Sequence, residues 1–595
     1  MLIIPLIFLL GASAPTQRAA ISDTYVKHEY RIPMRDGVKL YTAVYVPKSA
    51  DGKHPIMLER TPYSAGPYGA NKFPFRFDGS PKFAENDYIF ATQDVRGRYM
   101  SEGKWEEIRP IKAKPGTKET DESTDAYDTV EFLIKNVPSN NGRVGLWGIS
   151  YPGFYAAAAL NNSHPAIKAV SPQAPVTEWF FGDDVHHNGA FFLQDNFDFY
   201  FGFGYDLPAP AEDHPNIESF GRRPDAREFF LKLGSAINAD KQYYKGRIPF
   251  WLDICNHDAY DDFWKARSTA RHLKNVKAAV LTVGGLFDAE DMYGPWDVYA
   301  GIKENNKGAI NHLVVGPWTH GGWAGGTGSS YAGYKFGMNT STEFREKIEF
   351  PFFDAYLRGD GKFDHPKVQV FDTGANAWRN FAEWPPTKET KPFDLYLAGN
   401  GQLSESGNSA GTDRYIVDPA DPIPYQPGVI TGRRSTYMGE DQTFLKDRKD
   451  ILRYSTPELS EDLRLCGPVV ADLKVSTTGT DADFIVKVID VTPEGAERLV
   501  RWEVMRGKFR KDFSKPVPFK PNVPDTVSFK LNPMFHTFLK GHKLMVQIQS
   551  SWFPLIDLNP NKFCNIYKAE PDDYQKATIS VHRGTSGSRI RFGRL

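Results

Sequence analysis

The sequence has 595 residues, of which 41% are apolar and 14% aromatic, with 51 Gly and 43 Pro. That length exceeds what one hydrophobic core usually serves, so we expect two or three domains. Lys plus Arg number 72 against 73 Asp plus Glu, and a net charge of -1 supplies no broad field for nucleic acid or an anionic membrane. Any electrostatic function must therefore be local.

The N-terminus resembles a secretory leader. Residues 2–10 form an apolar run that is too short to span a bilayer, and the small residues Ala12-Ser13-Ala14 follow it. No Lys or Arg precedes the run and Pro15 follows the cleavage point, so an ordinary apolar terminus stays open. We predict a signal peptide over residues 1–20 and an exported protein, periplasmic or secreted, or a cytoplasmic one if this segment is not a signal.

The chain has three cysteines, Cys255, Cys466 and Cys564, without the paired spacing of a zinc site. The simplest interpretation is that they are small buried hydrophobic residues. In an exported protein, a Cys466–Cys564 disulfide remains an alternative.

The first half of the chain alternates predicted strands and helices. Polar and apolar residues alternate from Tyr25 to Val46 around Asp36-Gly37, which predicts a β-hairpin. A helix is predicted to stop at Pro138, because Ala126, Val130, Leu133, Ile134 and Val137 share one face. Further strands are predicted at residues 56–58, 88–93, 144–147, 278–283 and 313–315. This order favours a mostly parallel sheet with helices on both faces.

Two other regions differ from this α/β pattern in their composition and in the spacing of their apolar residues. Residues 179–274 are rich in aromatics and poor in strand alternation, which predicts an inserted helical cap. After about Pro385, short alternating segments such as Phe393-Leu395-Leu397 are separated by Gly, Pro and Asp, as in a β-sandwich. We predict an α/β domain over residues 24–178 and 275–375, the cap, and a β-sandwich over 385–595.

Ser150 is the predicted nucleophile. It lies in the pattern G-x-S-x-x-G between a predicted strand and an apolar helix, where Gly148 and Gly153 relieve crowding at a nucleophile elbow. A turn with an incidental serine is the alternative. Residues 328–333 satisfy the same pattern without a preceding strand, and we interpret them as a loop. The predicted strand before Ser150 and the helix after it, rather than the pattern alone, therefore support Ser150 as the nucleophile.

A serine nucleophile needs a base, and the base needs an acid that fixes its tautomer. In α/β-hydrolases these residues follow the serine in the order Asp or Glu, then His. Asp288 and His320 occupy that order, each just past the end of a predicted strand. Either residue alone is more simply a solvated loop residue, whereas all three in order favour a catalytic triad.

The sequence resembles the peptidase S15 group of α/β-hydrolases, which includes cocaine esterase and X-Pro dipeptidyl peptidases, and within it the α-amino acid ester hydrolases. The resemblance extends over nearly the whole chain, through residues 60–63, 93–98, the elbow and 287–294. It implies an α/β-hydrolase domain with an inserted helical cap and a C-terminal jelly-roll β-sandwich domain, no cofactor and no metal. It also suggests a homotetramer.

The resemblance assigns roles to individual residues. Ser150, Asp288 and His320 become the triad, and the Tyr63 hydroxyl with the Tyr151 backbone N–H becomes the oxyanion hole. Without the resemblance, Tyr63 is a packed aromatic.

Three carboxylates carry the most specific part of the resemblance: Asp184, Glu290 and Asp291 match the cluster that binds the substrate α-ammonium. A buried ammonium needs such negative acceptors. The alternative is that these acids lie on solvated loops, and the choice of Asp184 over Asp183 depends on register alone. Val185-His186 replaces an aromatic usual in the family, which puts the shape of the acyl pocket in doubt.

A metal site built on Asp183, Asp184, His186 and His187 is a weaker alternative, because adjacent histidines diverge in most backbones. We therefore expect a serine hydrolase of small-molecule α-amino acid esters; α-amino β-lactam amides are a further possible substrate, and acyl transfer to amines a further possible reaction. An X-Pro dipeptidyl peptidase and a generic carboxylesterase stay open, as does a glycan- or surface-binding jelly-roll protein. We expect no nucleic-acid partner and no membrane span.

Overall fold

The computed structural model describes residues 20–49, 52–112, 116–213 and 223–595. Apart from Ala20, the signal peptide predicted for residues 1–20 lies outside the described residues. Within these ranges no helix has the length and apolar character needed to cross a bilayer. Cys255, Cys466 and Cys564 are free thiols, so the alternative of a Cys466–Cys564 disulfide is not realised in this structure.

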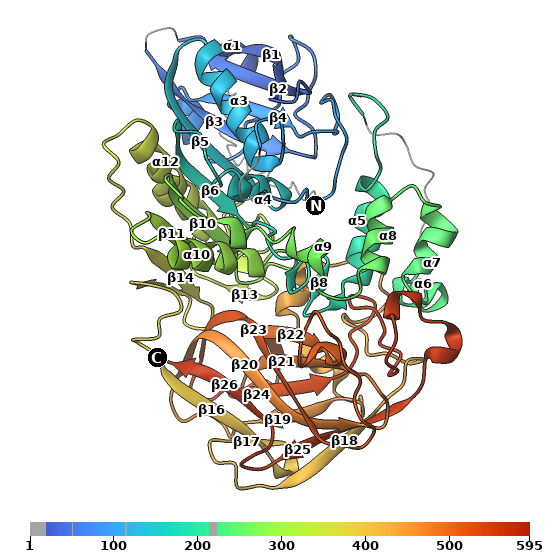
Figure 1. Ribbon diagram of the computed structural model, residues 1–595. Coiled ribbons are helices and arrows are strands. Elements are labelled where there is room, and N and C mark those ends of the chain that lie inside the picture. The colour runs from blue at the N-terminus through green and yellow to red at the C-terminus, as the bar shows by residue number, and fades with distance from the viewer. Residues whose placement is uncertain (1–19, 50–51, 113–115, 214–222) are drawn as a thin grey trace, which may run out of the picture.

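A ten-stranded sheet forms the N-terminal domain (Figure 1). The predicted hairpin forms its edge as β1 (Tyr25–Pro33) and β2 (Lys39–Pro47), paired antiparallel. Seven strands in the order β4-β3-β5-β6-β10-β11-β14 run parallel, and β15 closes the other edge antiparallel. Their bounds are β3 (His54–Thr61), β4 (Ile89–Asp94), β5 (Asn140–Ile149), β6 (Ile167–Gln173), β10 (Ala279–Gly285), β11 (Asn311–Gly316), β14 (Val368–Asp372) and β15 (Ala377–Phe381).

Helices cover both faces of this sheet, as the strand and helix order predicts. One face packs on α3 (Glu122–Asn136), α4 (Tyr151–Ala158) and α10 (Tyr293–Asn305), and the other on α12 (Phe350–Leu357). The α3 helix begins where the Asp121 side chain accepts a hydrogen bond from Thr124 N at 2.9 Å. It ends before Pro138, and its residues Ala126, Val130 and Leu133 are buried. The apolar spacing in the sequence therefore marks the real buried face.

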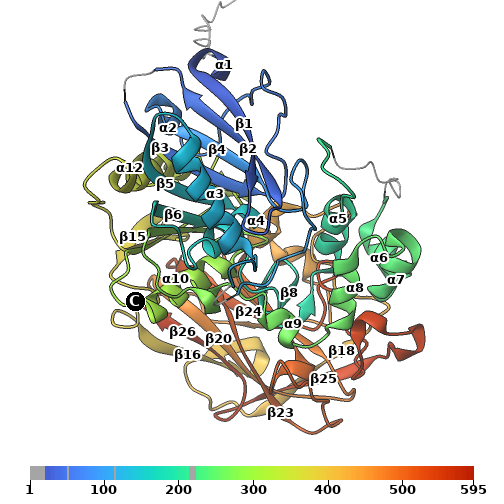
Figure 2. The same ribbon diagram turned by 45° about the horizontal axis from the view of Figure 1, so that its top comes forward.

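The segment between β6 and β10 forms a mainly helical cap. Figures 1 and 2 show its helices beside the sheet and above the sandwich. Most of its aromatics, including Phe191, Phe197 and Tyr200, are buried. The elements are β7 (Gly182–Asp183), β8 (His186–His187), β9 (Ala190–Phe191), α5 (Leu193–Phe203), α6 (Ala226–Leu233), α7 (Ile237–Ala239), α8 (Pro249–Asn256) and α9 (Asp262–Lys265).

The C-terminal region is an antiparallel β-sandwich, and among the pairs formed by its described strands only the short β17–β19 contact is parallel. One hydrophobic core continues from the cap into this domain. Backbone bonds also join them, for example Leu193 N to Leu555 O at 2.9 Å. The strands are β16 (Lys391–Ala398), β17 (Gln402–Ser404), β18 (Gly411–Val417), β19 (Leu452–Ser455), β20 (Leu463–Thr477), β21 (Asp483–Val491), β22 (Glu497–Arg506), β23 (Asp525–Phe538), β24 (Lys543–Gln549), β25 (Ala577–Arg583) and β26 (Arg589–Arg594).

Candidate active site

Ser150 lies at the sharp turn between β5 and α4. Its backbone has φ 67° and ψ -126°, a conformation that non-glycine residues adopt only when the surroundings hold it. A Cβ on Gly148 would lie 2.5 Å from Pro152, and one on Gly153 would lie 2.6 Å from Gln173 O. Both glycines are therefore required by close backbone approach. The turn is a nucleophile elbow at the carboxyl end of the parallel strands.

The serine of the second matching pattern has different surroundings. Ser330 is exposed and begins β12 (Ser330–Tyr331), which pairs with β13 (Tyr334–Lys335). This segment is a small hairpin rather than the loop we expected, and no helix follows it directly.

Asp288 and His320 meet beside the elbow. His320 Nδ1 donates to the two carboxylate oxygens of Asp288 at 3.0 and 3.1 Å, and Asp288 also accepts from the backbone N–H of Glu290 and of Asp291. Burial alone would raise the pKa of Asp288, but the charge and hydrogen bond of His320 outweigh it and hold the pKa below its usual value. An ionised Asp288 fixes the His320 tautomer that a general base needs.

The expected bond between the nucleophile and its base is replaced by contacts with carboxylates. Ser150 Oγ donates to Asp291 Oδ2 at 3.2 Å, and His320 Nε2 lies 3.5 Å from Glu290 Oε2. Among the described residues no direct hydrogen bond joins Ser150 and His320. Asp291 Oδ2 also lies 4.0 Å from His320 Nδ1, so the nucleophile and the imidazole both approach the Asp291 carboxylate. Catalytic hydrogen bonds often tighten only when substrate is bound.

Tyr63 and Tyr151 border the same site. Tyr63 follows β3, is 42% exposed, and its hydroxyl makes no hydrogen bond with any residue of the described ranges. Burial of the hydroxyl, followed by the charges of Asp184 and Asp291, raises the pKa of Tyr63 well above its usual value, so the hydroxyl remains a donor. Tyr151 is the first residue of α4, and its N–H therefore has no partner inside the helix.

Asp183 and Asp184 have opposite surroundings. Asp183 is fully buried and accepts from Thr177 N at 2.9 Å, Glu178 N at 3.1 Å and Gly294 N at 2.9 Å. Those bonds tie a turn to the start of α10, which is a structural role. Asp184 instead lines a 310 Å³ pocket together with Ser150. In the structure, therefore, Asp184 rather than Asp183 faces the pocket that contains Ser150.

Two members of the carboxylate cluster, Asp184 and Asp291, form no ion pair with a lysine or arginine of the described residues. Burial first, and the Glu290 carboxylate second, raise the pKa of Asp184 to about 7. Burial, with Asp184 next, raises the pKa of Asp291 well above its usual value, and Asp291 Oδ1 is buried without a hydrogen-bond partner in the described parts of the chain. A bound cation would stabilise these carboxylates in their charged form.

Three further charged residues line this pocket and were not predicted from the sequence. Asp195 and Asp198 come from α5, and Arg433 comes from the loop that precedes β19. Arg433 binds Asp195 at 2.8 Å and also pairs with Glu290. The i, i+3 spacing of the two aspartates was a usable signal that one helix face is acidic. No sequence pattern around Arg433 indicates that its side chain contacts Asp195 and Glu290.

The adjacent histidines do not form the alternative metal site. His186 Nδ1 lies 2.9 Å from Trp179 O and its Nε2 lies 2.7 Å from the Tyr567 hydroxyl, whereas His187 Nδ1 lies 2.8 Å from Glu503. Burial lowers the pKa of His186 to about 3. Within the ranges that the structure describes, no group of three or more His, Cys, Asp or Glu side chains is arranged so that it could hold a metal ion.

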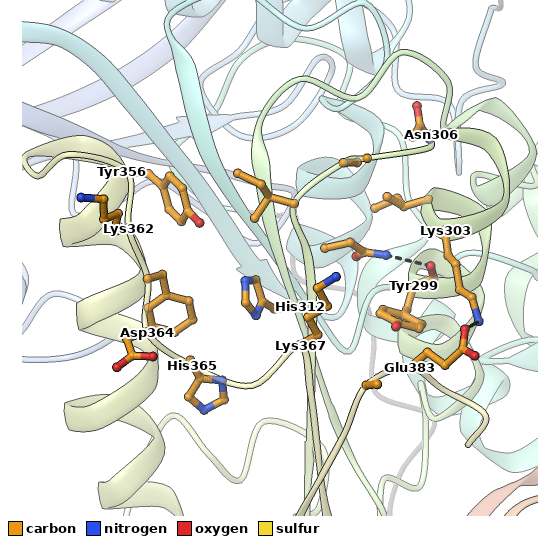
Figure 3. Close-up of a pocket in the computed structure, with 18 residues that line it drawn as sticks. Tyr299, Lys303, Asn306, His312, Tyr356, Lys362, Asp364, His365, Lys367 and Glu383 are labelled. Atoms are coloured by element: carbon orange, nitrogen blue, oxygen red, sulfur yellow. Dashed lines mark hydrogen bonds and ion pairs between the residues drawn. The ribbon is translucent and has the colours of Figure 1, made fainter. Parts of the chain in front are cut away.

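A second pocket, of about 860 Å³, lies away from Ser150 (Figure 3). Residues from the start of β11, including His312, line it together with Lys367, His365 and Tyr299. The predicted catalytic residues instead follow the carboxyl ends of the parallel strands, where sites of open α/β sheets lie.

Comparison with known proteins agrees with this architecture. The family model described as X-Pro dipeptidyl-peptidase (S15 family) matches residues 36–322, and the model for the X-Pro dipeptidyl-peptidase C-terminal non-catalytic domain matches residues 361–589. Among curated proteins, the cocaine esterase of Rhodococcus sp. (strain MB1 Bresler) is 28% identical over 93% of this chain and 95% of its own length.

Two solved structures superpose along nearly the entire chain. An alpha-amino acid ester hydrolase is 36% identical, with a TM-score of 0.89 and full coverage of both chains. An aminopeptidase from a marine sediment Thaumarchaeota archaeon is 34% identical, also with a TM-score of 0.89, over 98% of this chain and 99% of that one. Fold and similarity together define a serine hydrolase of the α/β-hydrolase class. The chain belongs to the S15 family.

Proposed function

We propose that this protein hydrolyses α-amino acid esters through an aminoacyl-enzyme on Ser150. The observation that carries the proposal is the contact between Ser150 Oγ and Asp291 Oδ2 at 3.2 Å, because a buried carboxylate beside the nucleophile is suited to receive an ammonium close to the scissile carbonyl. Asp184 and Glu290 line the same pocket. A substrate whose ammonium lies close to its scissile carbonyl fits this arrangement.

Covalent geometry favours an aminoacyl over a dipeptidyl substrate. The α-nitrogen of an aminoacyl group lies about 2.5 Å from its carbonyl carbon, whereas an X-Pro dipeptidyl group moves the amine away by about one further residue, roughly 3.5 Å. Because the cluster begins within hydrogen-bond distance of Ser150 Oγ, the shorter separation is the better match. The similarity to an alpha-amino acid ester hydrolase and to an aminopeptidase supports the same choice.

In the proposed mechanism the α-ammonium binds Asp184, Glu290 and Asp291, which frees Ser150 Oγ to pair with His320. His320 Nε2 takes the serine proton while Oγ bonds to the ester carbonyl carbon, and the Tyr63 hydroxyl and Tyr151 N–H receive the oxyanion. Collapse breaks the bond to the alcohol, which leaves with the proton from His320.

Water then attacks the aminoacyl-enzyme by the same steps and releases the amino acid. An amine, such as that of a β-lactam nucleus, would compete with water and give acyl transfer.

The test compares the methyl esters of phenylglycine and phenylacetic acid, which differ in the α-amine. We expect kcat/KM to favour phenylglycine by at least about a hundredfold, since an unpaired buried charged cluster costs several kcal/mol. Ser150→Ala is the control and should abolish turnover of both. Equal specificity constants would refute the ammonium site, and release of anilide from Gly-Pro-anilide at a comparable rate would favour the dipeptidyl peptidase instead.

A further inference from the structure

The 310 Å³ pocket holds a second acidic pair besides the proposed ammonium site. Asp195 and Asp198 both project from α5 into the space that an acyl side chain would enter, together with Phe199 and Tyr200. Carboxylates in this position would ordinarily favour a second positive charge on the substrate, as in lysyl or arginyl esters. The two acids are, however, already paired within the chain.

Arg433 neutralises the first of them. Its Nη1 donates to Asp195 Oδ2 at 2.8 Å and its Nη2 donates to Glu290 Oε1, so one guanidinium bridges Asp195 and Glu290. The side chain is 24% exposed and lines the pocket. A guanidinium stays charged at every pH that proteins tolerate, and its planar fork matches carboxylates closely. Arg433 is therefore a permanent cation in the acyl pocket.

Arg223 neutralises the second. It forms an ion pair with Asp198, and its guanidinium lies 5.3 Å from the ring centroid of Phe230 and 5.4 Å from that of Phe229. Asp184 differs from both of these acids, because no lysine or arginine of the described ranges forms an ion pair with it. Asp291 likewise has no such partner there; of the basic side chains with a described ion-pair contact, His320 is the one near it, at 4.0 Å. The chain thus supplies cations to the acyl pocket and leaves Asp184 and Asp291 to the substrate.

We propose that Arg433, assisted by Arg223, determines specificity by occupying the second cation position, so that the enzyme accepts α-amino acyl groups with uncharged side chains and rejects those with a second positive charge. This inference rests on the proposed function. A lysyl side chain entering the pocket would meet carboxylates that are already neutralised and a guanidinium of like charge. In a partly dehydrated pocket that repulsion is weakly screened.

The experiment compares the methyl esters of norleucine and lysine, which differ by the terminal ammonium. The wild-type protein should favour norleucine in kcat/KM by at least about a hundredfold. Arg433→Gln should move this ratio toward lysine by at least about tenfold, because Asp195 and Glu290 lose their internal cation. Arg433→Lys keeps the charge and should keep the ratio within about threefold.

Arg434→Gln is the matched control. Arg434 is the next residue, its side chain is 50% exposed, and it lies 3.7 Å from Glu440 outside the pocket, so the ratio should not move. Asp195→Asn gives a reciprocal test if Arg433→Gln fails to fold. It leaves Arg433 less neutralised, and the preference for glutamate methyl ester relative to glutamine methyl ester should rise by at least about threefold.

A wild-type enzyme that uses both esters equally would overturn the inference, and so would a ratio that stays constant while Arg433→Gln slows both esters alike. The second result is what a purely structural arginine would give. Failure of the proposed function itself has a different signature. In that case the phenylglycine and phenylacetic esters are used equally, whatever the side-chain preference.

Discussion

His320 lies among more negative charge than a general base usually meets. Burial alone would lower its pKa, but the carboxylates of Asp288 and Glu290 outweigh burial and raise the pKa to about 10. A base accepts a proton only in its neutral form, so the free enzyme holds His320 mostly protonated at neutral pH. Binding of the substrate ammonium would offset part of this negative charge and bring the base toward its working range.

This charge balance predicts the pH dependence of the reaction. For an uncharged ester, kcat/KM should rise with pH up to about 10, whereas for an amino ester it should fall again as the α-amine loses its proton near pH 8. Glu290→Gln removes the carboxylate that lies 3.5 Å from His320 Nε2 and should shift the uncharged-ester profile down by about one pH unit. Glu343→Gln, which alters a surface pair with Lys347, is the control. Coincident wild-type and Glu290→Gln profiles would contradict this account.

Local signals in the sequence were sufficient to predict that Ser150, Asp288 and His320 lie near one another, because each follows a recognisable strand. They could not separate Asp183 from Asp184. Asp183 ends β7 and Asp184 lies in the turn that follows, and only the packing of this turn decides which of the two carboxylates faces the pocket. Arg433 carries no local signal, since it contacts Glu290 across 143 residues.

At the level of elements, the turn from β5 into α4 depends on the absence of a side chain at Gly148. In Gly148→Ala the new Cβ would lie 2.5 Å from both the backbone and side chain of Pro152, neither of which can move freely. We expect a loss of about 1–3 kcal/mol in the free energy of unfolding and slower labelling of Ser150 by a fluorophosphonate. Denaturant unfolding and the labelling rate measure the two effects.

Gly202→Ala is the matched control for Gly148→Ala. Gly202 is an exposed residue of α5, and a Cβ there would have no atom within 4 Å. Alanine should stabilise the protein by about 0.5–1 kcal/mol and leave labelling unchanged. If both substitutions behave alike, close packing is not what the elbow requires.

In the β-sandwich, alternation of apolar and polar residues predicts the position of a strand better than it predicts which side chains are exposed. In β24 the apolar residues Leu544, Val546 and Ile548 alternate with polar or sulfur-containing ones and are buried, but Gln547 between them is also buried. It lies opposite Arg453 and Lys487 on the neighbouring strands, and Lys487 Nζ donates to Gln442 Oε1 at 2.9 Å. The polar face of β24 is therefore covered by a connecting segment, and a pattern within one strand contains no information about that cover.

At the scale of the whole molecule, the β-sandwich holds the loop that carries Asp288. Arg501 of β22 donates to Leu286 O at 3.0 Å, and the Tyr437 hydroxyl donates to Ala289 O at 3.2 Å. These contacts join residues 215 and 148 positions apart. The domain order was predictable from composition, but this cooperation between domains was not, because it depends on how their surfaces meet.

Arg501→Met should therefore impair catalysis from outside the α/β domain. Arg501 is 2% exposed and forms no ion pair within the described ranges, so its replacement leaves no ion-pair partner behind, and denaturant unfolding separates the effect on stability from the effect on rate. We expect kcat for phenylglycine methyl ester to fall by at least about tenfold, because the carbonyl of Leu286 loses its donor and the Asp288 loop loses a fixed position. Arg498→Met alters a half-buried arginine on the same strand that lies over the Tyr334 ring, and kcat should then stay unchanged. An unaltered kcat in Arg501→Met, with the fold intact by circular dichroism, would show that the loop positions Asp288 without help from the sandwich.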